Sequence, residues 1–567
     1  MARTDRADTP PPEAADTSRR GFLTMIGLGA AAVVAGETSV LTGCSKRAGA
    51  QGSAASAESV LALMPSYKPL ELVKPDIPGD LTTPSGYFQY PAKIVRAVLR
   101  KPGSGGPMIH SMLPFWGPTP PGLGHNAFID AVNAELGVTV NPSVQDGNVY
   151  GGKLSAILAA RDIPDILCIP NWEVDKTPRF SQAVKALFAD LTEHLKGDAV
   201  SAYPMLATLS TNAWQYSVWG GRLAAVPYPT DGPFPYAFFY RKDLTDRAGI
   251  AAPKTIDELY AFGKKLTNPD RGVWAFGNVF DMVQMFFKCP GSKGGWGKSP
   301  SGGLVFKYET PQYRQAVEFT ARLFRDGLVH PDLVASRGGD AQQLFAAGKM
   351  IAWQEGPGVW RNMQSEQSKV TPGFEMQPIP LFSAVGGDPI AWVNDEPVFY
   401  TFVKKGLGRE RTQEILRVLD WCAAPFGSHE YELNNYGLEG VHFTRAADGS
   451  PIPNQVFRKE YASQFWVTGG RVPAVVGTAD VPHFVSDLLG YFKTSLKYAE
   501  RNLFQGIKLE LPANYSKLLT NTEDKINDLL RGRRPLSDLD VIVKEWRRSG
   551  GDEGREFLER ALAANGR

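Results

Sequence analysis

Between residues 108 and 169, short apolar runs alternate with stretches that repeat apolar side chains at helical spacing. The runs at 108–113, 138–140 and 165–169 have the length and composition of buried strands. The stretches 124–136 and 150–160 carry apolar residues three or four positions apart, which is typical of amphipathic helices. Strand, helix, strand, helix and strand in this order predict an α/β unit with a parallel sheet.

Helical signals recur further along the chain. Thr255-Ile-Asp-Glu258 is a capping box that predicts a helix through about residue 266. Thr310-Pro311 predicts the start of another helix, which Gly327 ends. No repeat of fixed period is present. Further helical stripes lie at 409–422, 481–504 and 520–531, and the last begins with a second capping box, Thr520-Asn-Thr-Glu523.

The N-terminal 43 residues have the layout of an export signal. Arg19 and Arg20 precede an apolar run that Glu37 interrupts. At about a dozen residues this run is too short to cross a bilayer, and twin arginines before such a run are typical of twin-arginine export. Leu41-Thr-Gly-Cys44 resembles a bacterial lipobox, whose cysteine thiolate takes the lipid. We therefore expect residues 1–43 to be a twin-arginine lipoprotein signal peptide and Cys44 to be lipidated.

Residues 44–106 are predicted to be a lipid-anchored tether and an extended arm. From Ser45 to about Ser59 the chain is mostly Gly, Ala and Ser, which is typical of a flexible linker. The following stretch to Pro107 is rich in proline and shows no clear period.

Composition narrows the class of protein. The chain has 567 residues, more than the roughly 250–300 that one core supports. Lys and Arg number 61 against 59 Asp and Glu, a net charge of +2, so we expect no nucleic-acid partner. Four cysteines without CxxC spacing exclude a dense disulfide scaffold and a cysteine zinc site. Apart from Cys44, the cysteines allow either one disulfide or three buried thiols: Cys168, Cys289 and Cys422.

The middle of the chain resembles a known family. Gly221–Pro227 followed by Phe238–Leu244 is similar to the central signature of family 1 extracellular solute-binding proteins, the receptors of ABC importers. Leu-Ala-Ala replaces the usual tyrosine-containing middle of the signature hairpin. The resemblance covers roughly residues 105–560. Later segments that agree are 345–360, 436–443, 523–532 and 540–546, the last three with the longer lipoprotein branch.

The resemblance implies an α/β fold of two lobes joined by hinge strands, the type II periplasmic-binding-protein fold. Lobe 1 is expected to span 107–229 with part of 395–480, and lobe 2 to span 230–394 with part of 481–567. A solute that contacts both lobes favours hinge closure. The expected partner is a membrane ABC permease, near which a lipid anchor raises the local concentration of the receptor. We expect a monomer without cofactor or metal, anchored on the extracellular face of a bacterial membrane.

Aromatic residues beside polar ones suggest a saccharide as the solute. Aromatic rings pack on the C–H faces of sugars, and carboxylates and amides bind their hydroxyls. Ligands of parallel sheets bind beyond the carboxyl ends of strands, which favours Phe115, Trp116, Asn171 and Trp172. A peptide or another polar solute is an alternative to a saccharide. The other candidates are Tyr228 and Asp231 after the expected hinge strand, Trp353 and Glu355, Trp392 and Asn394, Trp274, Trp466, Tyr436 and Glu439.

Each candidate has a structural alternative. A tryptophan can serve core or inter-lobe packing, and Glu439 can tie a loop near the hinge. Signs of catalysis are weak, because the seven histidines are scattered and no G-x-S-x-G or HExxH motif occurs. Gly297-Lys-Ser299 lacks the first glycine of a phosphate loop and is predicted to be a surface loop. The sequence contains no EF-hand loop, and a calcium site made of scattered carbonyl groups is an alternative that it leaves open.

The leading hypothesis is a lipid-anchored receptor that captures an oligosaccharide or sugar derivative for an ABC importer and is not an enzyme. One alternative is a secreted carbohydrate-active hydrolase or lyase that uses paired carboxylates. Another is a lipid-anchored sensor that uses the same cleft.

Overall fold

The computed structural model describes residues 52–567 except 332–337, 462–467, 480, 482 and 513. The chain divides into the units Met1–Gly49 and Ala50–Arg567. The predicted signal peptide, with Arg19 and Arg20, and the predicted lipidation site Cys44 lie outside the described residues, as does Trp466. The description below concerns the second unit.

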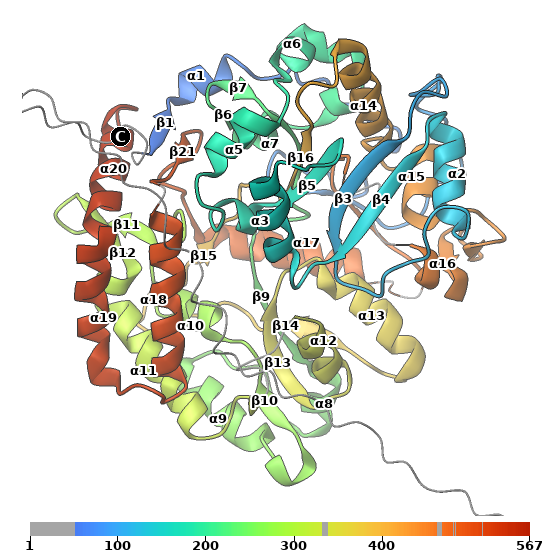
Figure 1. The fold of residues 1–567 in the computed structure, drawn as a ribbon. Helices are drawn as coiled ribbons and strands as arrows, with labels where there is room; N and C mark the ends of the chain where they lie inside the picture. Colours follow the sequence, from blue (N-terminus) through green and yellow to red (C-terminus); the bar gives the residue numbers. More distant parts are fainter. Residues whose placement is uncertain (1–51, 332–337, 462–467, 480, 482, 513) are drawn as a thin grey trace, which may run out of the picture. The chain divides into compact units, whose positions relative to one another are not determined.

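A five-stranded sheet forms the first of two lobes and has the order β4-β3-β5-β16-β8. β3 pairs in parallel with β4 and β5, which confirms the predicted parallel unit, whereas β16 is antiparallel to β5 and β8. We name the part built on this sheet lobe 1 (Figure 1). Its strands are β3 (Ile109–Phe115), β4 (Val140–Asp146), β5 (Ile166–Pro170), β8 (Ala225–Tyr228) and β16 (Phe399–Val403).

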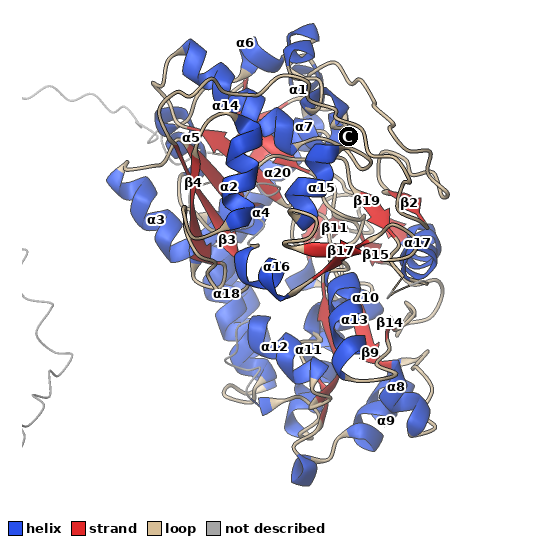
Figure 2. Cartoon of the chain, turned by 90° about the vertical axis from the view of Figure 1, so that its right-hand side faces the viewer, coloured by secondary structure: helices blue, strands red, loops and turns tan. Residues whose placement is uncertain are grey.

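Helices cover both faces of the lobe 1 sheet, and Figure 2 shows α2 and α3 on either side of strands β3 and β4. One core contains side chains of α2 and α14, and the other contains side chains of α3 and α5. α2 begins where the Asn126 side chain accepts the Ile129 N–H, and it ends at Gly137 with φ 67°. These helices are α2 (Ala127–Leu136), α3 (Tyr150–Ala160), α5 (Phe180–Leu187) and α14 (Arg409–Cys422).

A four-stranded sheet of order β10-β13-β9-β14 forms lobe 2. β10 is parallel to β13, and β9 is antiparallel to β13 and β14. One face packs against α9, α10, α11 and the C-terminal helices, and the other against α13 and α17. The strands are β9 (Ala237–Arg241), β10 (Trp274–Phe276), β13 (Met350–Glu355) and β14 (Met376–Pro378); the helices are α9 (Ile256–Leu266), α10 (Phe280–Phe286), α11 (Pro311–Arg325), α13 (Val359–Val370), α17 (Phe484–Ser495), α18 (Tyr515–Leu530), α19 (Leu539–Trp546) and α20 (Asp552–Ala563).

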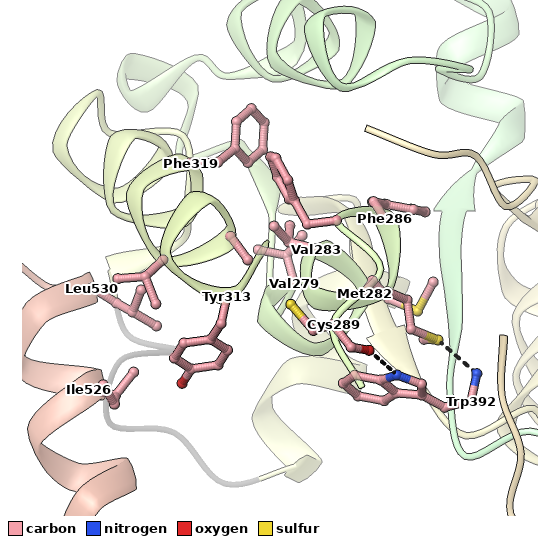
Figure 3. Packing of buried hydrophobic residues seen from close by; sticks show 14 of the residues in the cluster. Val279, Met282, Val283, Phe286, Cys289, Tyr313, Phe319, Trp392, Ile526 and Leu530 are labelled. Carbon is pink, nitrogen blue, oxygen red and sulfur yellow. Dashed lines mark hydrogen bonds between the residues drawn. The ribbon is translucent and has the colours of Figure 1, made fainter. Parts of the chain in front are cut away.

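The C-terminal helices belong to the lobe 2 core although the sequence places them far from its sheet. Figure 3 shows Ile526 and Leu530 of α18 facing Tyr313 of α11. α18 begins at Tyr515, five residues before the predicted capping box at Thr520. The Tyr515 hydroxyl accepts the indole N–H of the buried Trp296 at 3.0 Å, so tertiary contact explains the earlier start.

Several segments differ from their predictions. Of the strand predicted at 138–140, only Val140 belongs to β4, which continues to Asp146. The sequence pattern did not indicate the rest of this strand, because β4 is an edge strand whose later residues are polar and partly exposed. The helix expected over 481–504 is shorter: α17 ends at Ser495, and Ala499–Glu500 forms β20 beside β15 (Ala391–Trp392). Gly297-Lys-Ser299 is not a loop throughout, since β11 (Trp296–Lys298) pairs with β12 (Leu304–Phe306).

The predicted flexible tether was wrong from Ser53 onwards. β1 (Ser53–Ala55) pairs with β21 (Lys508–Glu510), and α1 (Ala57–Leu61) buries Val60 in a lobe 1 core. The small side chains of β1 do not hinder the pairing of its backbone, and Val60 of α1 supplies the apolar contact with the core. Further along the arm, β2 (Ser85–Tyr87) pairs in parallel with β19 (Ala474–Val476).

Two adjacent crossing segments connect the lobes. Residues 229–236 lead from β8 to β9, and residues 393–398 lead from β15 to β16. The Asn394 N–H donates to the Pro233 carbonyl at 2.8 Å, and the Val398 N–H donates to the Tyr228 carbonyl at 2.9 Å. These hydrogen bonds hold the two crossings side by side, as expected for a hinge.

Cys168, Cys289 and Cys422 are buried thiols that form no disulfide. Each lies in a different core cluster, so the alternative of three buried thiols describes them.

Candidate ligand-binding site

Two exposed tryptophans lie together at the carboxyl ends of β3 and β5. Trp116 is 45% exposed and Trp172 is 39% exposed. Their ring centroids are 5.8 Å apart, and both rings contact Phe399 of β16 at centroid distances of 6.3 and 5.8 Å. Tyr228 of β8 continues the row, 6.0 Å from Phe399. We name these four residues the aromatic platform, and its exposed rings offer a face for a ligand.

Local backbone geometry sets the platform in place. A Cβ at Gly147 would lie 2.3 Å from the Trp116 ring, so glycine at this position lets the ring lie across the loop after β4. Trp172 stands on the short helix α4 (Asn171–Val174), and the Asn171 N–H donates to the Val398 carbonyl at 3.0 Å. Phe115 ends β3 half-buried. The structure thus brings together the two predicted loops that follow these strands.

Asp231 lies on the crossing segment next to the platform. Its side chain is exposed to solvent, yet burial by surrounding protein raises its pKa, an effect that Arg471 partly offsets. Access to solvent with protein on several sides is typical of a group that lines a cleft. A Cβ at Gly358, in the turn after β13, would lie 3.7 Å from Asp231 Oδ2, so Asp231 adjoins lobe 2.

Arg471 supplies positive charge beside Asp231. A Cβ at Gly470 would lie 1.8 Å from the Pro227 carbonyl oxygen, so this glycine allows the chain to pass against the end of β8. The guanidinium of Arg471 donates to the Asn435 side chain and lies 5.0 Å from the Tyr431 ring centroid. Burial opposes the charge, but nearby tyrosines and Asp231 raise the pKa of Arg471 overall.

Lobe 2 presents carboxylates at the end of its sheet where β13 ends and β9 begins, next to the crossing segment 229–236. The pKa of Tyr236, just before β9, is raised by Asp281, by burial, and by Glu355 and Glu523. Burial also raises the pKa of Glu355, the last residue of β13. The Asp281 carboxylate accepts from the Gln354 amide at 2.6 Å and the Gln284 amide at 3.1 Å. We name this side of the site, with Tyr236, Asp281, Glu355 and Glu523, the acceptor edge.

Three predicted tryptophans are not part of the site. Trp353 is 1% exposed and packs on Phe345, and the buried Trp392 donates its indole N–H to the Cys289 carbonyl at 2.9 Å (Figure 3). Trp274 pairs with Met350 at the end of β13 opposite Glu355. Trp353 and Trp392 lie in strands, where one face points into the core, and Trp274 lies at the far end of the lobe 2 sheet, so the structure does not bring these three residues together with the platform.

The remaining candidates have structural contacts. The Asn394 side chain accepts the Glu396 N–H at 3.3 Å within its crossing segment. Tyr436 is buried, and its hydroxyl accepts from Arg361 at 3.2 Å. Glu439 is exposed and pairs with Arg445 at 2.9 Å, which agrees with its structural alternative.

Sequence reasoning missed Phe399, Arg471, Tyr236 and Asp281. Phe399 and Arg471 carry no local signal, because their role depends on strands brought together by the fold. Tyr236 directly precedes the signature strand, so its position was the one available hint. In the described part of the chain, no group of three or more His, Cys, Asp or Glu residues is placed to hold a metal ion. Among the same residues, no helix combines the length and apolar character needed to span a bilayer.

Comparison with known proteins agrees with this architecture. Residues 121–397 match the family model described as bacterial extracellular solute-binding protein. The chain is 24% identical over 351 residues to the polygalacturonan/rhamnogalacturonan-binding protein YtcQ of Bacillus subtilis (strain 168). That match covers 59% of this chain and 65% of YtcQ, less than two thirds of the length of that relative.

Solved structures share the fold at low sequence identity. The N-glycan transport solute-binding protein NgtS of Streptococcus pneumoniae has a TM-score of 0.58 at 15% identity, covering 81% of this chain and 99% of NgtS. The alginate-binding protein AlgQ2 has a TM-score of 0.57 at 13% identity, covering 82% of this chain and 99% of AlgQ2.

Fold and site together define a two-lobed α/β protein with exposed aromatic rings and carboxylates next to the segments that join its lobes. Residues 121–397 are thus similar to the bacterial extracellular solute-binding family, in agreement with the family resemblance of the sequence. The similar proteins are named as binding or transport proteins and not as enzymes.

Proposed function

We propose that this protein captures a carbohydrate, an oligosaccharide or a sugar derivative, between its lobes and delivers it to an ABC importer permease. The observation that carries the proposal is that the aromatic platform of lobe 1 and the acceptor edge of lobe 2 lie at the two ends of the crossing segment 229–236. Trp116 and Trp172 offer ring faces for the C–H face of a sugar, and carboxylates accept from its hydroxyls. The names of YtcQ, NgtS and AlgQ2 support a saccharide.

Capture follows from the arrangement of the crossing segments. A saccharide that touches both the platform and the acceptor edge gains contacts only when the lobes approach each other, so it favours the closed state. No step of this process alters the saccharide.

A ligand panel tests the proposal. Thermal shift and titration calorimetry are run with oligogalacturonides, rhamnogalacturonan fragments, alginate oligomers, N-glycan fragments and neutral fructo- and malto-oligosaccharides. We expect saturable binding of at least one class, with stabilisation of about 2.7 kcal/mol at a concentration 100 times Kd. Peptides and amino acids serve as controls. Absence of any saccharide binding, or recovery of a cleaved saccharide, contradicts the proposal.

We further propose that the chain is exported by the twin-arginine route and anchored through lipidated Cys44 on the extracellular face of a bacterial membrane. The order of Arg19-Arg20, a short apolar run and Leu-Thr-Gly-Cys44 supports this. Labelled palmitate is expected in the wild-type protein and absent from the C44A variant, and R19K/R20K is expected to block export. Palmitate in C44A contradicts the anchor.

A further inference from the structure

Lys293 belongs to lobe 2 but reaches residues that flank the aromatic platform. It stands in the loop between α10 and β11. This loop is fixed to lobe 2 by two hydrogen bonds, from the Gly291 N–H to Glu500 at 2.9 Å and from the Leu503 N–H to the Ser292 hydroxyl at 3.2 Å. The backbone at Lys293 therefore moves with this part of lobe 2.

The ammonium group of Lys293 contacts two carboxylates. Its Nζ lies 2.9 Å from Asp175 Oδ2 and 3.4 Å from Glu396 Oε1. Asp175 follows Trp172 by three residues on the end of α4, and Glu396 precedes Phe399 by three residues on the crossing segment. One side chain of lobe 2 thus ties together the two segments that carry the facing rings Trp172 and Phe399.

The environment of Lys293 differs from that of an ordinary surface ion pair. Exposed pairs contribute little because water screens them; here the Lys293 side chain is only 17% exposed, whereas Asp175 is 45% and Glu396 is 30% exposed. Burial would lower its pKa, yet Asp175 and Glu396 raise it above the usual value, so the ammonium is charged. Lys293 also has φ 43°, a strained backbone value for a residue with a side chain.

We propose that Lys293 is a positioning residue that couples approach of the lobes to the formation of the aromatic platform. In the closed arrangement it holds α4 and the crossing segment so that Trp172 and Phe399 keep their contact. When the lobes separate, Lys293 leaves Asp175, and α4 loses its tie to lobe 2. This inference rests on the proposed function for its purpose, but its physical content is independent of the identity of the solute.

The test compares K293M with K525M in the absence of saccharide. Methionine keeps the length and apolar body of lysine and removes the charge. Lys525 forms a matched ion pair with Glu545 at 2.5 Å, within the C-terminal helices of lobe 2, so its loss affects no contact between lobes. Hydrogen exchange at residues 171–176, the radius of gyration from small-angle scattering and the melting temperature are measured for both variants, for K293R, for D175N and for K293M/D175N.

For K293M we expect hydrogen exchange at 171–176 to be about tenfold faster, with a larger radius of gyration, while global stability changes little. D175N is expected to act in the same direction, the double variant no more than the stronger single one, and K293R is expected to restore slow exchange. K525M is expected to leave residues 171–176 unchanged. Unchanged exchange and radius in K293M, or additive effects in the double variant, overturn the proposal. No saccharide is used, so these measurements decide the role of Lys293 even if the ligand panel contradicts the proposed function.

Discussion

Trp116 and Trp172 keep a large fraction of their surface exposed. Exposed apolar area is unfavourable in water, and a partner that covers the rings removes this unfavourable contact. A ring that is free in the absence of solute can contribute its whole face to binding. The buried Trp353 and Trp392 contribute instead to the stability of lobe 2, because their indoles are already packed and, for Trp392, hydrogen-bonded. The same residue type therefore has two roles, and exposure distinguishes them.

Removal of either exposed ring tests the platform directly. We expect W116A and W172A each to raise the Kd of a saccharide that binds the wild-type protein at least about tenfold, or about 1.4 kcal/mol. The melting temperature should change little, because both rings are partly solvated before the change. Calorimetry and thermal melts provide the measurements. W274F is the control, since Trp274 lies at the opposite end of the lobe 2 sheet, and an unchanged Kd in both alanine variants excludes the platform as the binding face.

At the scale of elements, α14 is joined to the preceding part of lobe 1 by a buried carboxylate. Asp420 Oδ1 accepts the Met205 N–H at 2.8 Å and the Leu206 N–H at 2.9 Å. Burial raises the pKa of Asp420 to about 7, although these two hydrogen bonds lower it. The usual value near 3.8 applies when the chain is unfolded.

This raised pKa predicts a pH dependence of stability. Between about pH 4 and pH 7 the folded state holds a proton on Asp420 that the unfolded state has lost, so the free energy of unfolding falls as pH rises. Three pKa units at about 1.4 kcal/mol each set an upper value of about 4 kcal/mol. We expect D420N to make this decline smaller, since an asparagine oxygen can accept both N–H groups, while Glu500, whose pKa burial also raises to about 7, retains its own contribution. Urea unfolding from pH 4 to 8 measures it.

The same substitution at Asp190 is the control for loss of a negative charge. Asp190 is exposed and accepts the Thr192 N–H at 2.9 Å. D190N should retain the decline between pH 4 and pH 7. A D420N protein that shows the full wild-type decline would mean that other groups cause it.

Elements with local signals were predictable, and elements without them were not. α9 and α11 are capped by Thr255 and Thr310 as expected, because each threonine side chain accepts a backbone N–H three residues ahead. α14 has the predicted bounds. By contrast, β1 depends on pairing with β21, some 450 residues away in the chain, which no local pattern reveals. Strand pairing is a long-range interaction, so its outcome depends on the whole fold.

At the scale of the whole molecule, the lobes have separate cores that the crossing segments join. Cys289 lies in the core of lobe 2, whereas Cys168 and Cys422 lie in lobe 1. Burial raises the pKa of Cys289 to about 12 and also raises the pKa of the other two thiols. All three are thus protected both by low thiolate content and by packing.

These thiols report the integrity of each lobe. In the native protein at pH 8 we expect no labelling of Cys168, Cys289 or Cys422 by iodoacetamide within hours, and full labelling in guanidinium chloride. Peptide mass spectrometry reads each site separately. Intermediate denaturant should label Cys168 and Cys422 together, because they share a lobe. Native labelling, or a disulfide-linked pair of peptides, contradicts the packing described here.

The amino-acid sequence determined the mixed α/β class, the parallel unit of lobe 1, the starts of several helices and the family resemblance. These features depend on local periodicity, capping residues and short motifs, which act over a few residues. It also placed Trp116, Trp172 and Asp231 correctly near the ends of strands and the crossing between lobes.

Only the tertiary structure decided which aromatic residues stay exposed, that Phe399 and Arg471 join the site, and that Lys293 of lobe 2 reaches Asp175 and Glu396. These outcomes depend on which face of a strand meets a core and on which distant segments meet between the lobes. Burial and long-range charge contacts are properties of the assembled chain, so a pattern of neighbouring residues cannot specify them.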